Sequence, residues 1–192
     1  METILKKGIN KIMKIFYKNK SISIHLREIS RRAGMNENSV TRFLKQLEKE
    51  KILASKKDGN LKKYQINKNK LVFSVFCLMD IEKFEKLPEI RKRSIKIFLE
   101  KLDKKPLIVI LFGSTAQEKF TKNSDLDLLL IVNTKIIVKK AEEYSEAQTG
   151  IRINSFQINF QNLKKTEDKL VLSAINTGYP LTNHIKFYEE TL

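Results

Sequence analysis

Two apolar runs near the middle of the chain are separated by a polar segment, and the second run begins with two aspartates. The first run, LIVILF, spans residues 107–112, and the second, DLDLLLIV, spans residues 125–132. Both are rich in aliphatic residues and short enough to be buried β-strands. Gly113-Ser114 follows the first run directly. The aspartates need a partner, because a charge beside an apolar sheet is costly unless something neutralises it.

Asp125 and Asp127 are two positions apart, so on a strand both carboxylates point to the same face. Leu126 and Leu128 then point to the other face. Two like charges this close repel each other, and a divalent cation removes the repulsion. Mg²⁺ favours one or two carboxylates, with phosphate oxygens and water completing its coordination. The spacing therefore predicts that Asp125 and Asp127 bind a divalent metal ion, Mg²⁺ or Mn²⁺.

The Gly113-Ser114 pair supplies the other half of such a site. A glycine lets the backbone approach a phosphate closely, and TAQEKF at 115–120 predicts a short helix whose first N–H groups favour an anion. The Ser114 hydroxyl adds a further donor. Together with the two aspartates, this pair predicts a site for a metal-bound nucleoside triphosphate.

The order Gly113-Ser114, ten residues, Asp125-Leu126-Asp127, with an apolar strand on each side, resembles the nucleotidyltransferase superfamily that includes DNA polymerase β and kanamycin nucleotidyltransferase. It is most similar to the minimal members, small prokaryotic proteins often paired with a HEPN-family protein. The tail at 170–190 looks like their C-terminal helix and short strand. The resemblance implies that Asp125 and Asp127 are catalytic metal ligands. It also implies that ATP is the favoured nucleotide and that AMP is transferred to a hydroxyl.

The chain departs from this family pattern at two places. The family uses a third carboxylate on a later strand, which binds a metal ion and helps to deprotonate the attacking hydroxyl. The strand expected at 151–160, IRINSFQINF, contains no Asp or Glu. Its non-core positions are Arg152, Asn154, Gln157 and Asn159, and amides are poor general bases. The arginine that often follows the Gly-Ser pair is also absent from 115–118, so the sequence predicts a nucleotide site and leaves turnover open.

Most of the net charge of the chain lies in its first 70 residues. The whole chain has 38 Lys+Arg, 22 Asp+Glu and a formal net charge of +16. Residues 1–70 hold 19 Lys+Arg against 6 Asp+Glu, a net of +13, whereas residues 71–192 hold 19 against 16. A solvated surface would spread its charge more evenly. This concentration predicts a polyanionic partner for the first segment.

The same segment predicts helices and a hairpin in a particular order. Apolar residues at helical spacing predict three helices, at 3–17, 25–35 and 37–50. Gly34 is placed to end the second helix, and Asn36 can cap the third. Asp58-Gly59-Asn60 is a hairpin turn signal between two strand-like runs. The order resembles a winged helix-turn-helix DNA-binding domain.

This resemblance implies that the helix at 37–50 is a recognition helix in the major groove of double-stranded DNA. Its side away from the core carries residue types that read base edges and hold phosphates: Asn38, Ser39, Thr41, Arg42 and Lys45. Four hairpin lysines are expected to contact backbone phosphate: Lys56, Lys57, Lys62 and Lys63. A protein-interaction module or a small helical domain with a solvated lysine face is the alternative. A palindromic target would be read by a dimer, so a homodimer is the favoured state.

The expected fold is α+β, with a winged helix-turn-helix domain at 1–70, a helical connector at 71–105 and a nucleotidyltransferase-like domain with a small mixed sheet at 106–192. In the connector, helical spacing places Ile90, Ile95 and Phe98 on the buried side. No apolar run reaches the ~18 residues of a membrane helix, and no signal-peptide segment is visible. A cytoplasmic protein without a membrane partner is expected.

The two resemblances together predict a DNA-binding protein whose second domain binds NTP and Mg²⁺ and transfers a nucleotide to a hydroxyl. An active enzyme is favoured, and two alternatives stay open. In the first, the chain is a transcriptional regulator whose nucleotidyltransferase domain is catalytically degenerate. In the second, it is an antitoxin-like module that acts on a HEPN-family partner.

Overall fold

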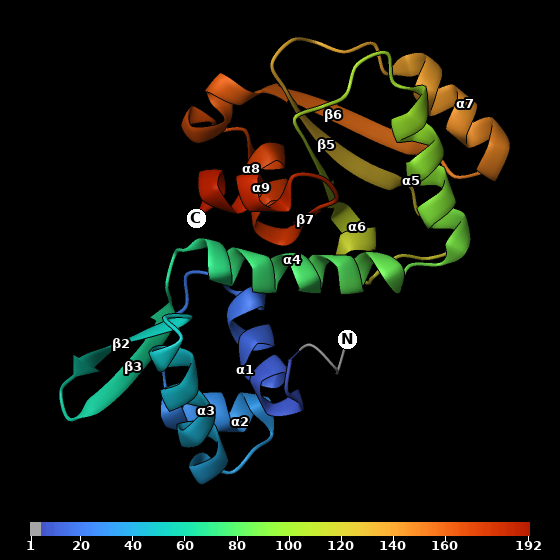
Figure 1. Ribbon diagram of the computed structural model, residues 1–192. Helices are drawn as coiled ribbons and strands as arrows, with labels where there is room; N and C mark the ends of the chain where they lie inside the picture. The colour runs from blue at the N-terminus through green and yellow to red at the C-terminus, as the bar shows by residue number, and fades with distance from the viewer. Residues whose placement is uncertain (1–4) are drawn as a thin grey trace. The chain divides into compact units, whose positions relative to one another are not determined.

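The structure, a computed structural model, describes residues 5–192, so the first four residues of the predicted domain at 1–70 lie outside the described part. The chain forms two compact units (Figure 1). The first unit ends at Met79 and includes Leu192, and the second unit spans Asp80–Thr191. The boundary falls inside helix α4 (Lys70–Glu85). The segment predicted as a connector forms α4 and α5 (Glu89–Lys101), and α5 belongs to the second unit.

The first unit combines helices with a small antiparallel sheet. Its helices before α4 are α1 (Lys7–Lys18), α2 (Leu26–Ala33) and α3 (Glu37–Lys49). Its strands are β1 (Ile24–His25), β2 (Leu53–Asp58) and β3 (Leu61–Ile66), in the order β1-β3-β2. The predicted hairpin is confirmed, because Asp58 pairs with Leu61 across Gly59 and Asn60. The three predicted helices are confirmed over the described residues.

The turn between α2 and α3 forms as the sequence predicts. Gly34 ends α2 in the left-handed conformation, with φ 60° and ψ 47°. The side chain of Asn36 accepts a hydrogen bond of 2.8 Å from the backbone N–H of Ser39, which satisfies one free donor of the first turn. The three helices bury apolar side chains, among them Ile12, Met13, Phe16, Ile29, Val40, Leu44 and Leu47. The three helices therefore pack against one another around these side chains.

The second unit is built on a four-stranded sheet. The strands are β4 (Ile108–Phe112), β5 (Leu126–Val132), β6 (Ile153–Asn159) and β7 (Tyr179–Pro180), in the order β6-β5-β4-β7. β4 runs antiparallel to β5 and β7, whereas β5 and β6 are parallel. The predicted small mixed sheet is therefore confirmed. The remaining elements are α6 (Gly113–Ala116), α7 (Lys139–Thr149), the 3₁₀ helix η1 (Phe160–Lys165), α8 (Lys169–Thr177) and α9 (His184–Thr191).

The two faces of this sheet differ in what covers them. Helices α5 and α7 lie together on one side of the sheet, and α8 and α9 lie on the other (Figure 1). Leu111, Leu128 and Leu130 on the first face share a buried core with Ile95 and Phe98 of α5. Strand alternation then turns the neighbouring positions to the second face. This second face carries the polar side chains described below.

Two sequence predictions in this unit are wrong in detail. The short helix expected at 115–120 begins instead at Gly113, because the chain turns at the end of β4, and Glu118 adopts φ 59° just after the helix. Ile90 was expected in the core, but it is 44% exposed and Arg91 is buried in its place.

In the described residues 5–192, no helix combines the length and the apolar character needed to span a membrane.

Candidate functional site

The two aspartates converge on one amide group. Asp127 lies at the start of β5 opposite Phe112, the last residue of β4, and Asp125 comes just before the strand. Asn154 on β6 pairs with Asp127 across the parallel register. Its Nδ2 lies 3.2 Å from Asp125 Oδ2 and 3.2 Å from Asp127 Oδ1, close enough to donate to both. All three side chains are half-buried, so a ligand can reach them.

Gly113 is packed against one of these carboxylates. Its φ is +70°, in the left-handed region where only glycine is unstrained. A Cβ added there would overlap Asp127 Oδ2. The left-handed backbone therefore favours glycine at the end of β4, and a larger residue would also displace the Asp127 carboxylate. The structure brings Gly113 together with the aspartate pair, as the sequence predicts.

Replacing Gly113 by alanine should lower the free energy of unfolding by about 2–4 kcal/mol. Gly150 is the matched control, because its φ is +69° and an added Cβ would meet nothing within 4 Å. Gly150→Ala carries only the left-handed cost of about 1–2 kcal/mol. Denaturant unfolding of both variants measures the difference. Equal losses would contradict the contact between position 113 and Asp127.

Ser114 is half-buried in the four-residue helix α6. The last residue of this helix, Ala116, is bound by a lysine of α4. Lys83 Nζ donates a hydrogen bond of 3.0 Å to the carbonyl oxygen of Ala116 and lies 4.8 Å from the centroid of the Tyr179 ring. The arginine absent from 115–118 has no side-chain substitute inside the short helix. Ser114 directly follows Gly113 and is half-buried, whereas Thr115, the other hydroxyl residue of α6, is buried.

Arg91 is the residue of this site that sequence reasoning missed. It is 2% exposed on α5, and its guanidinium reaches the segment that connects β4 to β5. Nη1 donates to Thr115 Oγ1 at 3.0 Å, and Nη2 donates to the carbonyl oxygens of Thr121 at 2.9 Å and Ser124 at 2.8 Å. The guanidinium also lies 4.5 Å from the centroid of the Phe120 ring.

These contacts determine where Asp125 lies, because it directly follows Ser124. Burial lowers the pKa of Arg91, and the nearby Asp125 carboxylate partly offsets this effect.

The sequence did contain a signal that Arg91 is buried. Arg91 is four residues before the buried Ile95 and so shares its helix face. A cation on an apolar stripe is the pattern that could have revealed it.

The donor set suits one hard divalent ion. In the described residues, no group of three or more His, Cys, Asp or Glu side chains is placed to hold a metal ion. The aspartate pair offers only oxygen ligands, and one oxygen of each carboxylate lies 3.2 Å from Asn154 Nδ2. Oxygen ligands are those that Mg²⁺ and Mn²⁺ prefer. Phosphate oxygens and water would have to complete the coordination.

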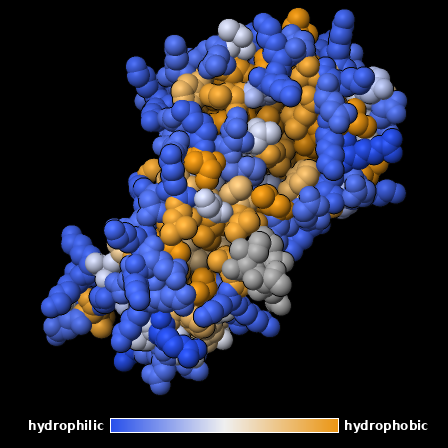
Figure 2. Space-filling model, viewed as in Figure 1, coloured by the Kyte–Doolittle hydropathy of each residue, from blue (hydrophilic) through white to orange (hydrophobic). Residues whose placement is uncertain are grey.

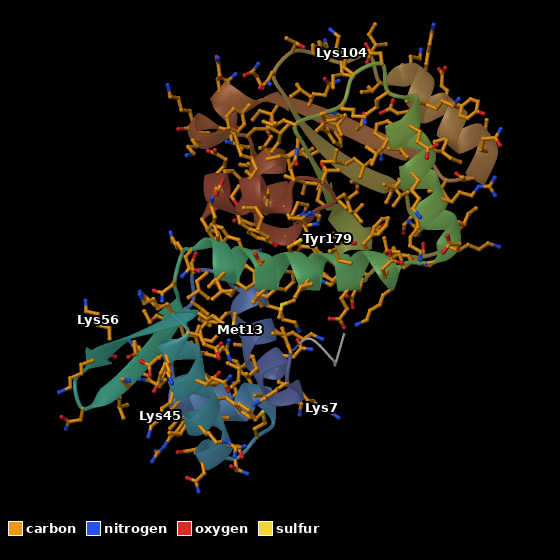
Figure 3. All side chains as sticks on the ribbon, viewed as in Figure 1. Lys7, Met13, Lys45, Lys56, Lys104 and Tyr179 are labelled. Carbon is orange, nitrogen blue, oxygen red and sulfur yellow. The ribbon has the colours of Figure 1, made fainter. Side chains whose placement is uncertain are left out.

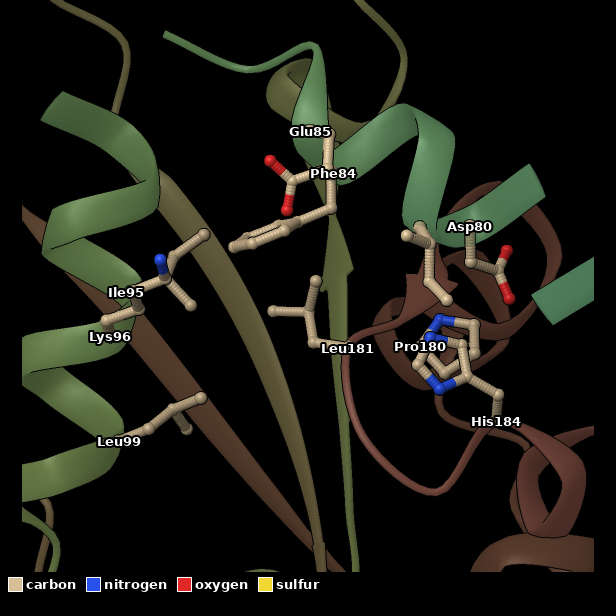
Figure 4. Close-up of a pocket in the computed structure, with 10 residues that line it drawn as sticks. Asp80, Phe84, Glu85, Ile95, Lys96, Leu99, Pro180, Leu181 and His184 are labelled. Atoms are coloured by element: carbon tan, nitrogen blue, oxygen red, sulfur yellow. The ribbon is translucent and has the colours of Figure 1, made fainter. Parts of the chain in front are cut away.

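One cavity of the second unit does not contain this site. It has a volume of about 270 Å³, and Phe84, Ile95, Leu99 and Leu181 line it (Figure 4). His184 lies at its edge, and burial lowers the pKa of this histidine. None of its lining residues is Gly113, Ser114 or one of the two aspartates. The half-buried carboxylate pair therefore lies outside this cavity.

The residues predicted to bind DNA lie on the surface of the first unit. On α3, Asn38, Arg42 and Lys45 are exposed, and Ser39 and Thr41 are half-buried. Lys45 and Lys56 extend into solvent from α3 and from the β2–β3 hairpin (Figure 3). The surface of this region is mainly hydrophilic (Figure 2).

The four hairpin lysines fall into two pairs with different surroundings. Lys56 and Lys57 on β2 are exposed. Lys62 forms an ion pair of 2.9 Å with Glu48, and Lys63 forms one of 2.6 Å with Asp58. Surface ion pairs of this kind contribute only about 0–1 kcal/mol, so a phosphate can compete for both lysines. Glu48 also accepts from Ser55, which joins the hairpin to α3.

The family model described as "Polymerase beta, Nucleotidyltransferase" matches residues 93–185. This segment contains Gly113, Ser114, Asp125, Asp127 and Asn154, and it begins just after Arg91. The match supports a nucleotidyltransferase-like module in the second unit. A search of curated proteins found no match.

Three solved structures resemble parts of the chain at low similarity. The first is the protein AF1382 from Archaeoglobus fulgidus, with 18% identity, a TM-score of 0.36, and coverage of 42% of this chain and 93% of that one. The second is MepR, a transcription regulator of a Staphylococcus aureus multidrug efflux pump. It has 16% identity and a TM-score of 0.36, and the match covers 52% of this chain and 78% of that one. The third is a toxin-antitoxin solved with AMP-PNP. It has 15% identity and a TM-score of 0.41, and the match covers 54% of this chain and 84% of that one. These values are too low to assign a fold or a function to the chain.

Proposed function

We propose that the second unit binds a nucleoside triphosphate together with a divalent metal ion, Mg²⁺ or Mn²⁺. Asp125 and Asp127 would hold the ion, and Gly113 and Ser114 would hold the phosphates. The observation that carries the proposal is the approach of both carboxylates to Asn154 Nδ2, next to a glycine at which an added Cβ would meet the Asp127 side chain. ATP is the favoured nucleotide on the strength of the family resemblance. The ion would neutralise phosphate charge.

The reaction proposed for this site is transfer of AMP to a hydroxyl of a protein or a small molecule. The hydroxyl oxygen forms a bond to the α-phosphorus while the bond from that phosphorus to the bridging oxygen breaks. Pyrophosphate leaves with the electron pair of the broken bond, and the hydroxyl proton passes to water. Asp125, positioned through the Arg91 contacts to its loop, would hold the ion that binds the reacting phosphate.

Binding and transfer are tested separately with the full chain. Titration with a non-hydrolysable ATP analogue should give saturable binding in Mg²⁺ and at least about tenfold weaker binding in EDTA. Equal affinity in both solutions would contradict the role of a metal ion. Incubation with ATP labelled at the α-phosphate then tests transfer, and binding without labelled product would favour a catalytically degenerate regulator.

We also propose that the first unit binds double-stranded DNA as a winged helix. The α2-turn-α3 pair, the exposed polar face of α3 and the net charge of +13 over residues 1–70 support this second function. In this arrangement α3 would enter the major groove, and the β2–β3 hairpin would contact phosphates.

The antitoxin-like alternative instead requires a HEPN-family protein as the partner of this chain. Adding a purified HEPN-family protein to the transfer assay tests whether that protein accepts AMP.

Changing Lys56 and Lys57 to glutamine should weaken binding to all DNA sequences about equally. Each lost phosphate contact should reduce the slope of log K against log salt by about 1. Lys139→Gln/Lys140→Gln is the control, because it removes the same charge from exposed positions on α7. Mobility shifts at several salt concentrations measure the slopes. An equal change in both variants would mean that overall charge, not the hairpin, determines affinity.

A further inference from the structure

We infer that Asn154 limits the site to one divalent ion and holds the two carboxylates together when that ion is absent. This inference rests on the proposed nucleotide site and concerns how the site is loaded. Asn154 faces Asp125 and Asp127 from β6, and one amide nitrogen donates to both at 3.2 Å. A neutral side chain therefore occupies the position from which a third ligand would reach the pair.

The position of Asn154 is fixed by the backbone and not by its own side chain. The parallel register places Asn154 directly opposite Asp127, and the N–H of Leu126 donates to the carbonyl oxygen of Arg152 at 2.9 Å. The flanking Ile153 is buried, which turns Asn154 to the face of the carboxylates. Any side chain at this position therefore faces the pair.

The amide group has a clear electrostatic consequence. Two carboxylates that point at one site repel each other, and the N–H groups of Asn154 offset part of that repulsion. A bound divalent ion takes over this role, and the N–H groups must turn away so that the amide oxygen faces the ion. Two carboxylates balance the charge of a single divalent ion. A second ion beside the attacking hydroxyl would find phosphate oxygens and water but no third carboxylate of the protein, because Asn154 is neutral.

Asn154→Asp tests the inference, with Asn159→Asp as the matched control. Asn159 also lies on β6 and donates to a backbone carbonyl, that of Asn133, but it pairs with Val132 at the far end of the strand. Mn²⁺ bound per chain is measured by electron paramagnetic resonance at a saturating level of the non-hydrolysable ATP analogue. The expected stoichiometry is one ion for the wild type and for Asn159→Asp, and two ions for Asn154→Asp.

A second measurement needs neither nucleotide nor activity. In EDTA, Asn154→Asp should melt about 2–4 °C below Asn159→Asp, since three carboxylates then repel one another, and Mn²⁺ should restore its melting temperature. Asn154→Ala, which removes the donor without adding charge, should also melt below the wild type in EDTA.

The outcomes separate the inference from the proposed function. Two ions in the wild type, or one ion in Asn154→Asp, would overturn the limit to one ion. Unchanged melting of both Asn154 variants in EDTA would overturn the role of the amide in the empty site. If the wild type bound no nucleotide in Mg²⁺, the proposed function would fail, while the melting comparison would still decide whether Asn154 holds the pair.

Discussion

Replacing Arg91 by alanine is expected to lower the free energy of unfolding of the second unit by about 3–5 kcal/mol. The variant leaves three acceptors without their donor: the Thr115 hydroxyl and the carbonyl oxygens of Thr121 and Ser124. The Thr115 contact is buried, and the contacts to the two carbonyl oxygens are partly buried. An unsatisfied buried acceptor costs about 1–3 kcal/mol, and the lost side chain also leaves a cavity beside Phe120. Denaturant unfolding measures the loss, and hydrogen exchange of residues 108–132 locates it.

Arg93→Ala is the control for this prediction, because Arg93 lies on the same helix and is exposed. It should change the unfolding free energy by less than about 0.5 kcal/mol. Arg91→Lys should recover only part of the loss, since one ammonium group cannot reproduce the fork of the guanidinium. Equal effects of Arg91→Ala and Arg93→Ala would show that the buried arginine does not hold the β4–β5 connection.

The double variant Asp125→Asn/Asp127→Asn is expected to weaken binding of the ATP analogue in Mg²⁺ by about 100-fold or more. The ion loses both of its charged protein ligands, and phosphate oxygens alone must then hold it to the chain. The unfolding free energy in EDTA should change little, because the substitution removes the repulsion between the two carboxylates and also the attraction between Asp125 and the buried Arg91. Calorimetric titration and thermal unfolding measure the two effects.

Glu100→Gln/Asp103→Asn is the matched control for the double variant. Both residues are exposed, and the substitution removes the same two negative charges. It should leave nucleotide affinity within about twofold of the wild type, since exposed charges away from the site are largely screened by salt. A similar loss of affinity in both double variants would mean that net charge, and not the aspartate pair, governs binding.

The features that the sequence predicts well depend on short-range rules. Asp125 and Asp127 share a face because strand side chains alternate, and this geometry follows from their spacing alone. The end of α2 at Gly34 and the start of α3 at Asn36 follow from backbone conformation and capping. Each of these features requires only the identity of neighbouring residues.

The contacts that the sequence does not predict depend on pairing between distant segments. Asn154 reaches both aspartates only because β6 aligns in parallel with β5 in one register. Arg91 is buried because its partners lie on the β4–β5 connection, 24 to 33 residues away along the chain. Helical spacing alone ranked Ile90 above Arg91 as a core residue, since hydrophobicity was the only criterion available. The sequence could therefore locate the carboxylate pair but not the residues that position it.

The most direct test of the proposed nucleotide site is to locate the bound metal ion. Mn²⁺ and the non-hydrolysable ATP analogue are added to the isotope-labelled full chain, and paramagnetic broadening of amide resonances is recorded. We predict that Gly113, Ser114 and Asp127 lose intensity first and that Asp125→Asn/Asp127→Asn abolishes the effect. Broadening centred elsewhere, or broadening that persists in the double variant, would contradict a metal–nucleotide site at the aspartate pair.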